Sequence, residues 1–404
     1  MRLTVVGASA IAVSVAALLY ALAKSNYVVA SASIAIISLV VYDYYFAKSL
    51  SSECVEVKRI LSTAYAKELE NVEVTIEVVN RRRRYLPLVE IEDLLPPMLE
   101  AVSRNRFTIA LPSGYVARVR YWMRAKVPGE HCLESIAVCL YSPLMMFVNC
   151  FEVKNRSYLV ATPLAPKLEV CARTFSRLAG LVRGLSMQGL YDLESFREYS
   201  YGDDVRKIVW KVLARDRRLV VRVDRGESTA RVAAIVLLRK YAWVVGTEPN
   251  TLAQRVLRAF QAAIEALSMP GVEIDAFFLT SSVPRLVKSV RKGDARLASS
   301  YSWVSYLSGF ARPISELLNL CSSLGVDLSS YDYVILVTDL YTLAYEIESV
   351  VSVLARTRRG IVLAAIDESL DVDHVALAAA CSRELDVVNY ELSVASRELE
   401  VMIE

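Results

Sequence analysis

The stretch FREYSYGDDVRKIVWKVLAR, residues 196–215, joins an aromatic and basic run, a Gly-Asp-Asp turn and a short basic helix. Asp203 or Asp204 is expected to cap this helix, because a carboxylate there accepts hydrogen bonds from the first free N–H groups. Counted at about 100° per residue, its apolar residues share one face: Val205, Ile208, Val209, Val212 and Leu213. Arg206 and Trp210 lie one helical turn apart on the other face and can stack on each other.

The same stretch carries a family resemblance. Its residues Arg-x-Tyr, Gly-Asp, Arg, Trp-Lys, Ala-Arg and Leu, in that order, resemble the signature of the domain-of-unknown-function 58 family. Members of that family commonly have an immunoglobulin-like module before the signature, and often a von Willebrand factor A domain after it. They are frequently associated with MoxR-type AAA+ ATPases, in systems thought to mature or remodel other proteins. The resemblance implies an architecture and a protein partner rather than a reaction.

The signature also supplies the candidate site. Arginine and tryptophan that lose water on binding dominate interface energetics, so this face is expected to contact a protein partner. The candidate residues are Arg197, Tyr199, Gly202, Asp203, Asp204, Arg206, Trp210, Lys211 and Arg215. The sequence allows two interpretations of the Asp203–Asp204 pair. It can act as an acid–base pair, or it can cap the helix and pair with neighbouring arginines.

Toward the N-terminus, two apolar runs predict a transmembrane helical hairpin over residues 1–48. Leu3–Ala23 carries no charge, and Tyr27–Phe46 carries only Asp43, near its end. Each run is long enough to cross a hydrocarbon core of about 30 Å at about 1.5 Å per residue. The alternative is a cleaved signal peptide, because Ala21-Leu22-Ala23 fits a small-x-small cleavage site.

Either reading leaves the rest of the chain on the side where Arg2 starts. Lys48, Lys58 and Arg59 follow the second run and indicate a cytoplasmic location. The seven cysteines contain no C-x-x-C pair, and we expect them to be reduced thiols, which suits the cytoplasm. The net charge of +3 gives no general basic field, so nucleic acid is not an expected partner. The lipid bilayer is an expected partner.

Residues 53–165 predict an antiparallel β-sandwich. Val72, Val74, Ile76 and Val78 alternate with polar residues, as in a half-buried strand. Further short strands are expected at Cys54–Leu61, Tyr115–Tyr121, Ser135–Tyr141 and Phe147–Val153. The family resemblance implies that this module is immunoglobulin-like. The run Arg81–Arg84 either contacts anionic lipid headgroups or is a solvated hairpin tip, and the sequence leaves both open.

After a linker helix and the family signature segment, residues 166–228, the pattern changes. Over residues 229–404 apolar strands alternate with helices, which predicts a three-layer α/β domain with a parallel sheet. Strands are expected at Arg231–Leu238, Val272–Leu279, Tyr333–Thr338, Gly360–Ile366 and Asp386–Tyr390. Helices are expected at Leu252–Leu267, Tyr341–Ala355 and His374–Arg383, in parts of Arg285–Leu324 and at the C-terminal end. This order resembles the von Willebrand factor A domain.

That fold usually binds a divalent cation through an Asp-x-Ser-x-Ser loop after its first strand. Here the corresponding residues are Arg239-Lys240-Tyr241-Ala242-Trp243, where cations and aromatic rings replace the oxygen ligands. Only Asp339, after a later strand, is a residual candidate ligand. We therefore expect neither a metal nor a cofactor.

These observations favour a non-enzymatic, membrane-anchored adaptor with a cytoplasmic interaction surface. The family resemblance implies a MoxR-type AAA+ ATPase as its partner. A membrane-bound hydrolase that uses Asp203 and Asp204 with nearby arginines is the competing hypothesis. An extracytoplasmic adhesion protein is a third, suggested by a sandwich followed by an A-type domain. The sequence contains no P-loop, H-E-x-x-H or G-x-S-x-G motif.

Overall fold

The structure is a computed structural model. It describes residues 1–164, 193–199, 208–224, 230–268, 272–316, 321, 324–357, 359–367, 370, 372–388 and 390–395. The chain divides into two compact units. Unit 1 comprises residues 1–126 and 130–161, and unit 2 comprises residues 127–129 and 162–404. Each unit is described by itself.

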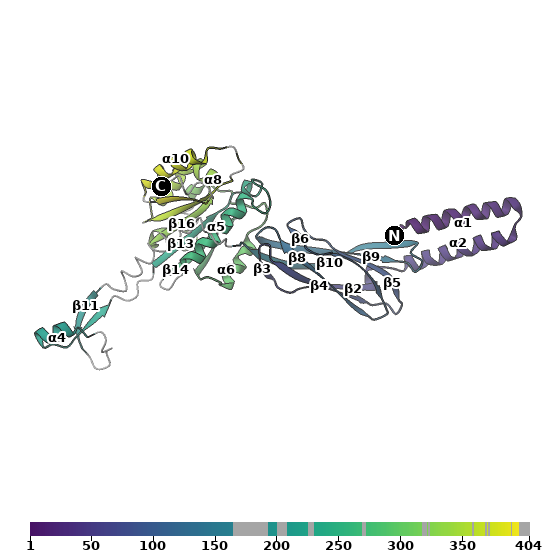
Figure 1. The fold of residues 1–404 in the computed structure, drawn as a ribbon, viewed down its shortest axis with the longest axis horizontal. Coiled ribbons are helices and arrows are strands. Elements are labelled where there is room, and N and C mark those ends of the chain that lie inside the picture. Colours follow the sequence, from purple (N-terminus) through teal and green to yellow (C-terminus); the bar gives the residue numbers. More distant parts are fainter. Residues whose placement is uncertain are drawn as a thin grey trace. The chain divides into compact units, whose positions relative to one another are not determined.

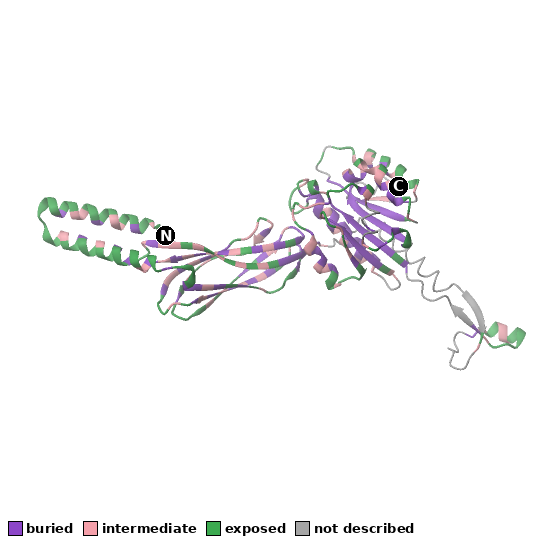
Figure 2. Cartoon of the chain, turned by 180° about the vertical axis from the view of Figure 1, so that it is seen from behind, coloured by how far each residue is buried: buried purple, intermediate pink, exposed green. Residues whose placement is uncertain are grey.

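Unit 1 begins with two helices that form a hairpin, α1 (Val5–Lys24) and α2 (Tyr27–Lys48) (Figure 1). The side chain of Thr4 caps α1 by accepting from the Gly7 N–H at 3.1 Å. Asn26 caps α2 in the same way. Both helices are long and apolar enough to cross a membrane, as the sequence predicts. Figure 2 shows that most of their surface is exposed, so their apolar side chains face outward.

The remainder of unit 1 consists of two mostly antiparallel sheets around one core. The first sheet has the order β1 (Arg2–Leu3), β10 (Phe147–Thr162), β9 (Gly129–Tyr141), β5 (Leu86–Asp93) and β7 (Arg106–Leu111), with β3 (Tyr65–Lys67) also paired to β10. The second has the order β2 (Val55–Leu61), β4 (Asn71–Asn80), β8 (Val116–Ala125) and β6 (Leu99–Ala101). A short 3₁₀ helix, η1 (Ser52–Cys54), leads from α2 into β2.

The alternating pattern in β4 decides which face is buried. Val72, Val74, Ile76 and Val78 are all buried, as predicted, while the residues between them are only partly buried. The other expected strands of this region are present, but β9 begins six residues earlier and β10 ends nine residues later than expected. The sequence does not predict β3, β5, β6 or β7.

A charged network lies inside this core. The guanidinium of Arg59 donates from Nε to Asp93 Oδ2 at 2.9 Å and forms an ion pair with the same carboxylate, and both side chains are fully buried. Its remaining N–H groups donate to the backbone carbonyls of Leu133, Ser135 and Asn155. The Tyr121 hydroxyl donates to Asp93 at 2.6 Å. Burial, and then the charge of Asp93, raise the pKa of Tyr121.

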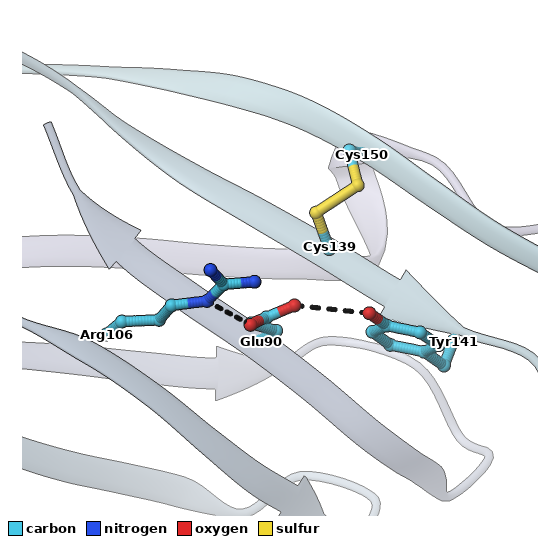
Figure 3. Close-up of a disulfide and its surroundings, with 5 residues drawn as sticks. All are labelled: Glu90, Arg106, Cys139, Tyr141 and Cys150. Carbon is cyan, nitrogen blue, oxygen red and sulfur yellow. Dashed lines mark hydrogen bonds and ion pairs between the residues drawn. A yellow bond between two sulfur atoms is a disulfide. The ribbon is translucent and has the colours of Figure 1, made fainter. Parts of the chain in front are cut away.

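The expectation that all seven cysteines are reduced is wrong. Cys139 on β9 and Cys150 on β10 form a disulfide (Figure 3). The two strands are neighbours in the sheet, which brings the two Cα atoms to 4.0 Å. Cys54, Cys132, Cys321 and Cys381 are free. On the same sheet, Glu90 pairs with Arg106 and accepts from the Tyr141 hydroxyl at 3.2 Å (Figure 3).

Unit 2 contains a six-stranded sheet that is parallel except at one edge. Its order is β15 (Arg285–Val290), β14 (Val272–Leu279), β13 (Ala230–Leu237), β16 (Tyr333–Asp339), β17 (Gly360–Ala365) and β18 (Tyr390–Ala395). Only β15 runs antiparallel, beside β14. The expected α/β region with a parallel sheet is therefore present.

Helices cover both faces of this sheet, which gives three layers. The α-helices beside this sheet are α5 (Leu252–Leu267), α6 (Ala295–Ser300), α8 (Leu340–Tyr345), α9 (Ile347–Leu354) and α10 (His374–Asp386). Helices α8, α9 and α10 share one apolar core with Phe277 and with alternate residues of the central strands. The next residue, Phe278, points to the opposite face, where its ring contacts Phe260 of α5.

Three details of unit 2 differ from the sequence prediction. The sequence does not predict strand β15, whose residues fall in a region expected to be partly helical. The single helix expected at Tyr341–Ala355 is interrupted at Glu346 into α8 and α9. Helix α10 extends to Asp386, so the last strand occupies Tyr390–Ala395 instead of Asp386–Tyr390. The expected C-terminal helix falls mainly on residues outside the described ranges.

Candidate functional site

The sheet of unit 2 has a topological switch point between β13 and β16. The chain moves from β13 outward through β14 to β15, and then returns to the other side of β13 as β16. In open α/β sheets, ligands bind at the carboxyl ends of the strands at such a point, because the connections leave in opposite directions. The residues that follow β13 and β16 are therefore the structural candidates for a site.

Asp339, the last residue of β16, is completely buried. It caps helix α8: Oδ1 accepts from the Thr342 N–H at 2.8 Å, and Oδ2 accepts from the Thr342 hydroxyl at 2.7 Å. The hydroxyl of Tyr241 donates to Oδ1 at 2.5 Å. Burial, and then the negative charge of Asp339, raise the pKa of Tyr241, so its hydroxyl stays protonated as a donor.

Arg239 closes the neighbouring part of the edge. Its Nη1 donates to the carbonyl of Phe310 at 2.7 Å and to that of Arg312 at 2.8 Å. Its Nη2 pairs with Glu346, whose other oxygen accepts from the Ile314 N–H at 2.9 Å. Arg239 thus fixes the segment before η5 (Ile314–Glu316) to the end of β13, and the interruption between α8 and α9 places Glu346 where this pairing needs it.

A second polar group follows β17. The carboxyl group of Asp367 is buried, and Oδ1 lies 3.9 Å from Nη2 of Arg255 on α5. Arg255 also donates to the Ile366 carbonyl at 2.8 Å. Nearby, the Tyr341 hydroxyl lies 2.7 Å from Nε2 of His374. Burial, and then the charge of Asp367, raise the pKa of Tyr341.

These residues do not fit a divalent cation. Both oxygens of Asp339 already accept hydrogen bonds from Tyr241 and Thr342, and the Arg239 guanidinium enters the same edge. Across the described parts of the chain, no group of three or more His, Cys, Asp or Glu side chains is placed to hold a metal ion. The edge is organised instead by hydroxyls, an ion pair and backbone carbonyls.

The signature residues lie on a separate small element. Strand β11 (Leu193–Glu198) pairs antiparallel with β12 (Val220–Asp224), and α4 (Trp210–Asp216) lies between them in sequence. Ile208 is buried and forms a β-bridge with Val221. The helix therefore begins at Trp210 with Val209 at its N-cap, later than the sequence predicts. The expected caps Asp203 and Asp204 lie outside the described residues.

The structure places some of the nine predicted partner-surface residues. Trp210 is 59% exposed, and Lys211 and Arg215 are exposed on the same helix. Arg215 contacts the adjacent Asp216 at 3.0 Å. Tyr199 is half-buried, and Arg197 lies on β11, opposite Val221. Gly202, Asp203, Asp204 and Arg206 lie outside the described residues, and so does the expected stacking of Arg206 on Trp210.

The sequence places Asp339 and the Arg239–Trp243 loop at one candidate metal site. It predicts neither the hydrogen bond from Tyr241 to Asp339 nor the roles of Thr342 and Glu346, which the fold brings there. The available signal is positional: Arg239 lies two residues after β13 and Asp339 is the last residue of β16, and these parallel strands end at the same edge of the sheet.

No protein-family model matches the chain, and no curated protein matches it. Solved structures match parts of it. The cupredoxin domain of amoB from Nitrosocaldus yellowstonii is 15% identical, with 28% of this chain and 90% of that chain covered and a TM-score of 0.20. A protein of unknown function from Porphyromonas gingivalis W83 is 13% identical, with coverages of 29% and 52% and a TM-score of 0.21. A b-glucosidase from Erythrobacter marinus is 12% identical, with coverages of 27% and 15% and a TM-score of 0.15. Likeness at these TM-scores carries no argument about fold or function.

Proposed function

We propose that this chain is a non-enzymatic, membrane-anchored adaptor of the domain-of-unknown-function 58 family. In this proposal α1 and α2 form a transmembrane hairpin, the sandwich of unit 1 is an immunoglobulin-like module, and the sheet of unit 2 belongs to a von Willebrand factor A-like domain. The length and apolar surface of the two helices support the anchor. The doubly wound strand order supports the assignment of unit 2.

The exposed side of α4 is the observation that carries the proposal. Trp210 exposes 59% of its surface beside Lys211 and Arg215. A large exposed indole flanked by cations has the composition of an interface anchor, because burying it against a partner removes much apolar area from water. The order of residues around it carries the family resemblance, and from that resemblance we propose a MoxR-type AAA+ ATPase as the partner.

The switch point of unit 2 supports action by contact rather than by ion binding. Asp339 is already engaged by Tyr241 and Thr342, and Arg239 by Glu346. An edge whose polar groups satisfy one another is pre-organised, and it can present a fixed surface to a protein without a bridging cation.

We further propose that both units lie in the cytoplasm. Arg2 and Lys48 flank the helical hairpin on the side of the sandwich, and basic residues flanking membrane spans favour the cytoplasmic side. Strand β1, which precedes α1, pairs with β10 of the sandwich. The two ends of the helical hairpin therefore lie on the same side of the membrane, as expected when the chain crosses it twice.

Affinity purification from native membranes tests the adaptor. The full-length chain and its Trp210→Ala variant are purified in mild detergent, and co-purifying proteins are quantified by mass spectrometry. We expect Trp210→Ala to weaken binding of an AAA+ ATPase about thirtyfold or more and to lower its recovery accordingly, because an anchoring tryptophan contributes about 2 kcal/mol or more. Trp122→Ala is the matched control, since Trp122 is 46% exposed on β8. Equal recovery with all three proteins would contradict the proposal.

The disulfide favours a second candidate, an extracytoplasmic adhesion protein. The Cys139–Cys150 bond is typical of an oxidising compartment. Protease added to intact cells separates the two candidates. The adaptor requires that both units are protected from the protease. Degradation of both units would establish the adhesion protein instead.

A further inference from the structure

The end of unit 1 that carries the helical hairpin is held together by polar contacts. Asp43, on α2, is buried and accepts from the Ser142 hydroxyl at 2.5 Å and from the Leu144 N–H at 3.1 Å. Thr4, at the start of α1, donates from its hydroxyl to the Met145 carbonyl at 2.6 Å. Both helices are thus fixed to the turn between β9 and β10. This turn marks the level at which the chain would leave the bilayer.

The loop of four arginines between β4 and β5 lies at the same level. Arg82 Nη2 donates to the Ser49 hydroxyl at 2.9 Å, and its guanidinium carbon lies 5.6 Å from the centre of the Phe46 ring. Phe46 belongs to the last turn of α2, and Ser49 is its C-cap. The arginine loop therefore contacts the end of the second apolar helix.

The backbone of this loop is held in one conformation. Buried Asn80 donates from Nδ2 to the Arg84 carbonyl at 2.9 Å and accepts from the Arg82 N–H at 2.9 Å. The Ser113 hydroxyl donates to the Arg82 carbonyl at 2.9 Å. The arginines thus project from a fixed loop, which reduces the entropy that a ligand must overcome on binding.

The charges of the loop are only partly neutralised. Arg81 pairs with Glu56, which also contacts Lys58 at 3.5 Å. Arg83 and Arg84 are exposed, and within the described part of the chain neither forms an ion pair. Lys48 adds another exposed cation at the end of α2. Glu53 in η1 is an exposed acid that offsets one positive charge in this region.

The surroundings have the composition of a membrane interface. Aromatic and apolar side chains are exposed at this level, as expected of residues that sit among headgroups. They are Tyr42, Tyr44 and Tyr45 near the end of α2, Tyr85 in the arginine loop, and Leu144 and Met145 in the turn between β9 and β10.

We infer that Arg83 and Arg84, with Arg82 and Lys48, form a binding site for the phosphate group of an anionic lipid. Guanidinium groups bind phosphate oxygens through paired N–H donors, and the apolar rim would hold the acyl side of the same lipid. This inference rests on the proposed membrane anchoring. The inference assigns a lipid ligand to the arginine loop, which the sequence alone also allows to be a solvent-exposed hairpin tip.

Lipid retention by the full-length protein tests the site. The protein is reconstituted into nanodiscs of phosphatidylcholine containing a minor fraction of phosphatidylglycerol, transferred to detergent, and assayed for bound lipid by native mass spectrometry. We expect selective retention of phosphatidylglycerol, and about a fivefold loss of apparent affinity for each arginine removed in Arg83→Gln/Arg84→Gln. The matched control is Arg104→Gln/Arg156→Gln, because both arginines are exposed on the same unit. Arg156 lies on β10, about 30 Å along the strand from Phe147.

The outcomes separate the site from the anchor. Failure to enter nanodiscs would overturn the anchoring and this inference with it. Entry without preference for phosphatidylglycerol, or an equal loss in both double variants, would overturn the lipid site alone. Displacement of the lipid by soluble glycerol phosphate would show a site for free phosphate esters and would also overturn it. Retention that falls only in Arg83→Gln/Arg84→Gln would establish it.

Discussion

The hydroxyl of Tyr241 donates a hydrogen bond to the buried carboxylate of Asp339, which lies 98 residues later in the chain. The bond joins the loop after β13 to the end of β16 at the switch point of the sheet. It occupies one oxygen of the only acid that the sequence nominates as a residual metal ligand. The same bond determines how this edge should respond to substitution and to cations.

Replacing Tyr241 with phenylalanine should loosen helix α8. The change removes one donor from a buried carboxylate, which costs about 1–3 kcal/mol. Hydrogen exchange of the α8 amides should accelerate correspondingly. Tyr345→Phe is the control, since Tyr345 is 91% exposed at the end of the same helix. Unchanged protection in Tyr241→Phe would show that the bond does not support the helix.

Millimolar Mg²⁺ should leave the thermal stability of unit 2 unchanged. A cation at this edge would have to displace the donors on Asp339 and lie near Arg239, and only binding to the folded state raises the melting temperature. Thermal unfolding is measured with Mg²⁺ and with a chelator. A rise of the melting temperature with Mg²⁺ that Asp339→Asn abolishes would contradict the conclusion that this edge does not fit a divalent cation.

Replacing Arg59 with methionine should destabilise unit 1 by about 3–5 kcal/mol. The substitution leaves the Asp93 carboxylate buried without its cation, and such a group is strongly destabilising. Pulse proteolysis in urea, with fragments of unit 1 identified by mass, measures the effect. Arg120→Met serves as the exposed control, because its side chain is 68% exposed and its ion pair with Glu73 should contribute at most about 1 kcal/mol. Similar losses in the two variants would refute the assigned role of the buried pair.

Replacing Asp43 with alanine should free the turn between β9 and β10. Ser142, Leu144 and Met146 would each lose an acceptor, so the amides of Leu144 and Met146 should exchange faster. Ser38→Ala, an exposed substitution on the same helix, should leave them protected. Equal exchange in the wild type and Asp43→Ala would mean that other contacts hold the turn.

Unit 2 should lose stability at alkaline pH. Burial raises the pKa of Tyr390 from 10.0 to about 12, so the folded state retains a proton that the unfolded chain releases. The contribution of this shift to the free energy of unfolding is complete below pH 10 and is lost as the pH rises toward 12. The loss is at most about 2.7 kcal/mol, since each pKa unit corresponds to about 1.36 kcal/mol. The urea midpoint of unit 2 between these pH values should fall less steeply in Tyr390→Phe. Identical slopes would exclude Tyr390 as the cause.

Period and length in the sequence predict the regular elements well. Strand β4 alternates strictly, and α5 has the predicted bounds Leu252–Leu267. Edge elements are harder to predict. Strand β15 has six residues and one neighbour in the sheet, so its pattern is weak. The signature helix starts late because Ile208 pairs with Val221, and a local helical pattern does not contain that contact.

The candidate edge of unit 2 could be predicted only in part. Asp339 stands out because it ends a buried strand, but its contact with Tyr241 depends on how two distant loops meet. The disulfide is similar, because the spacing of Cys139 and Cys150 becomes informative only when β9 and β10 are known to be neighbours. In both cases the missing information is the pairing of strands, which local propensity does not specify.

The attachment of both helices to one turn has a mechanical consequence. Since Thr4 and Asp43 hold the turn between β9 and β10 from two helices, the hairpin cannot pivot freely at its base. Membrane helices tilt when bilayer thickness changes. In the proposed anchored state, such a tilt would turn the sandwich by a similar angle, so the thickness of the surrounding lipid would set the direction in which unit 1 points.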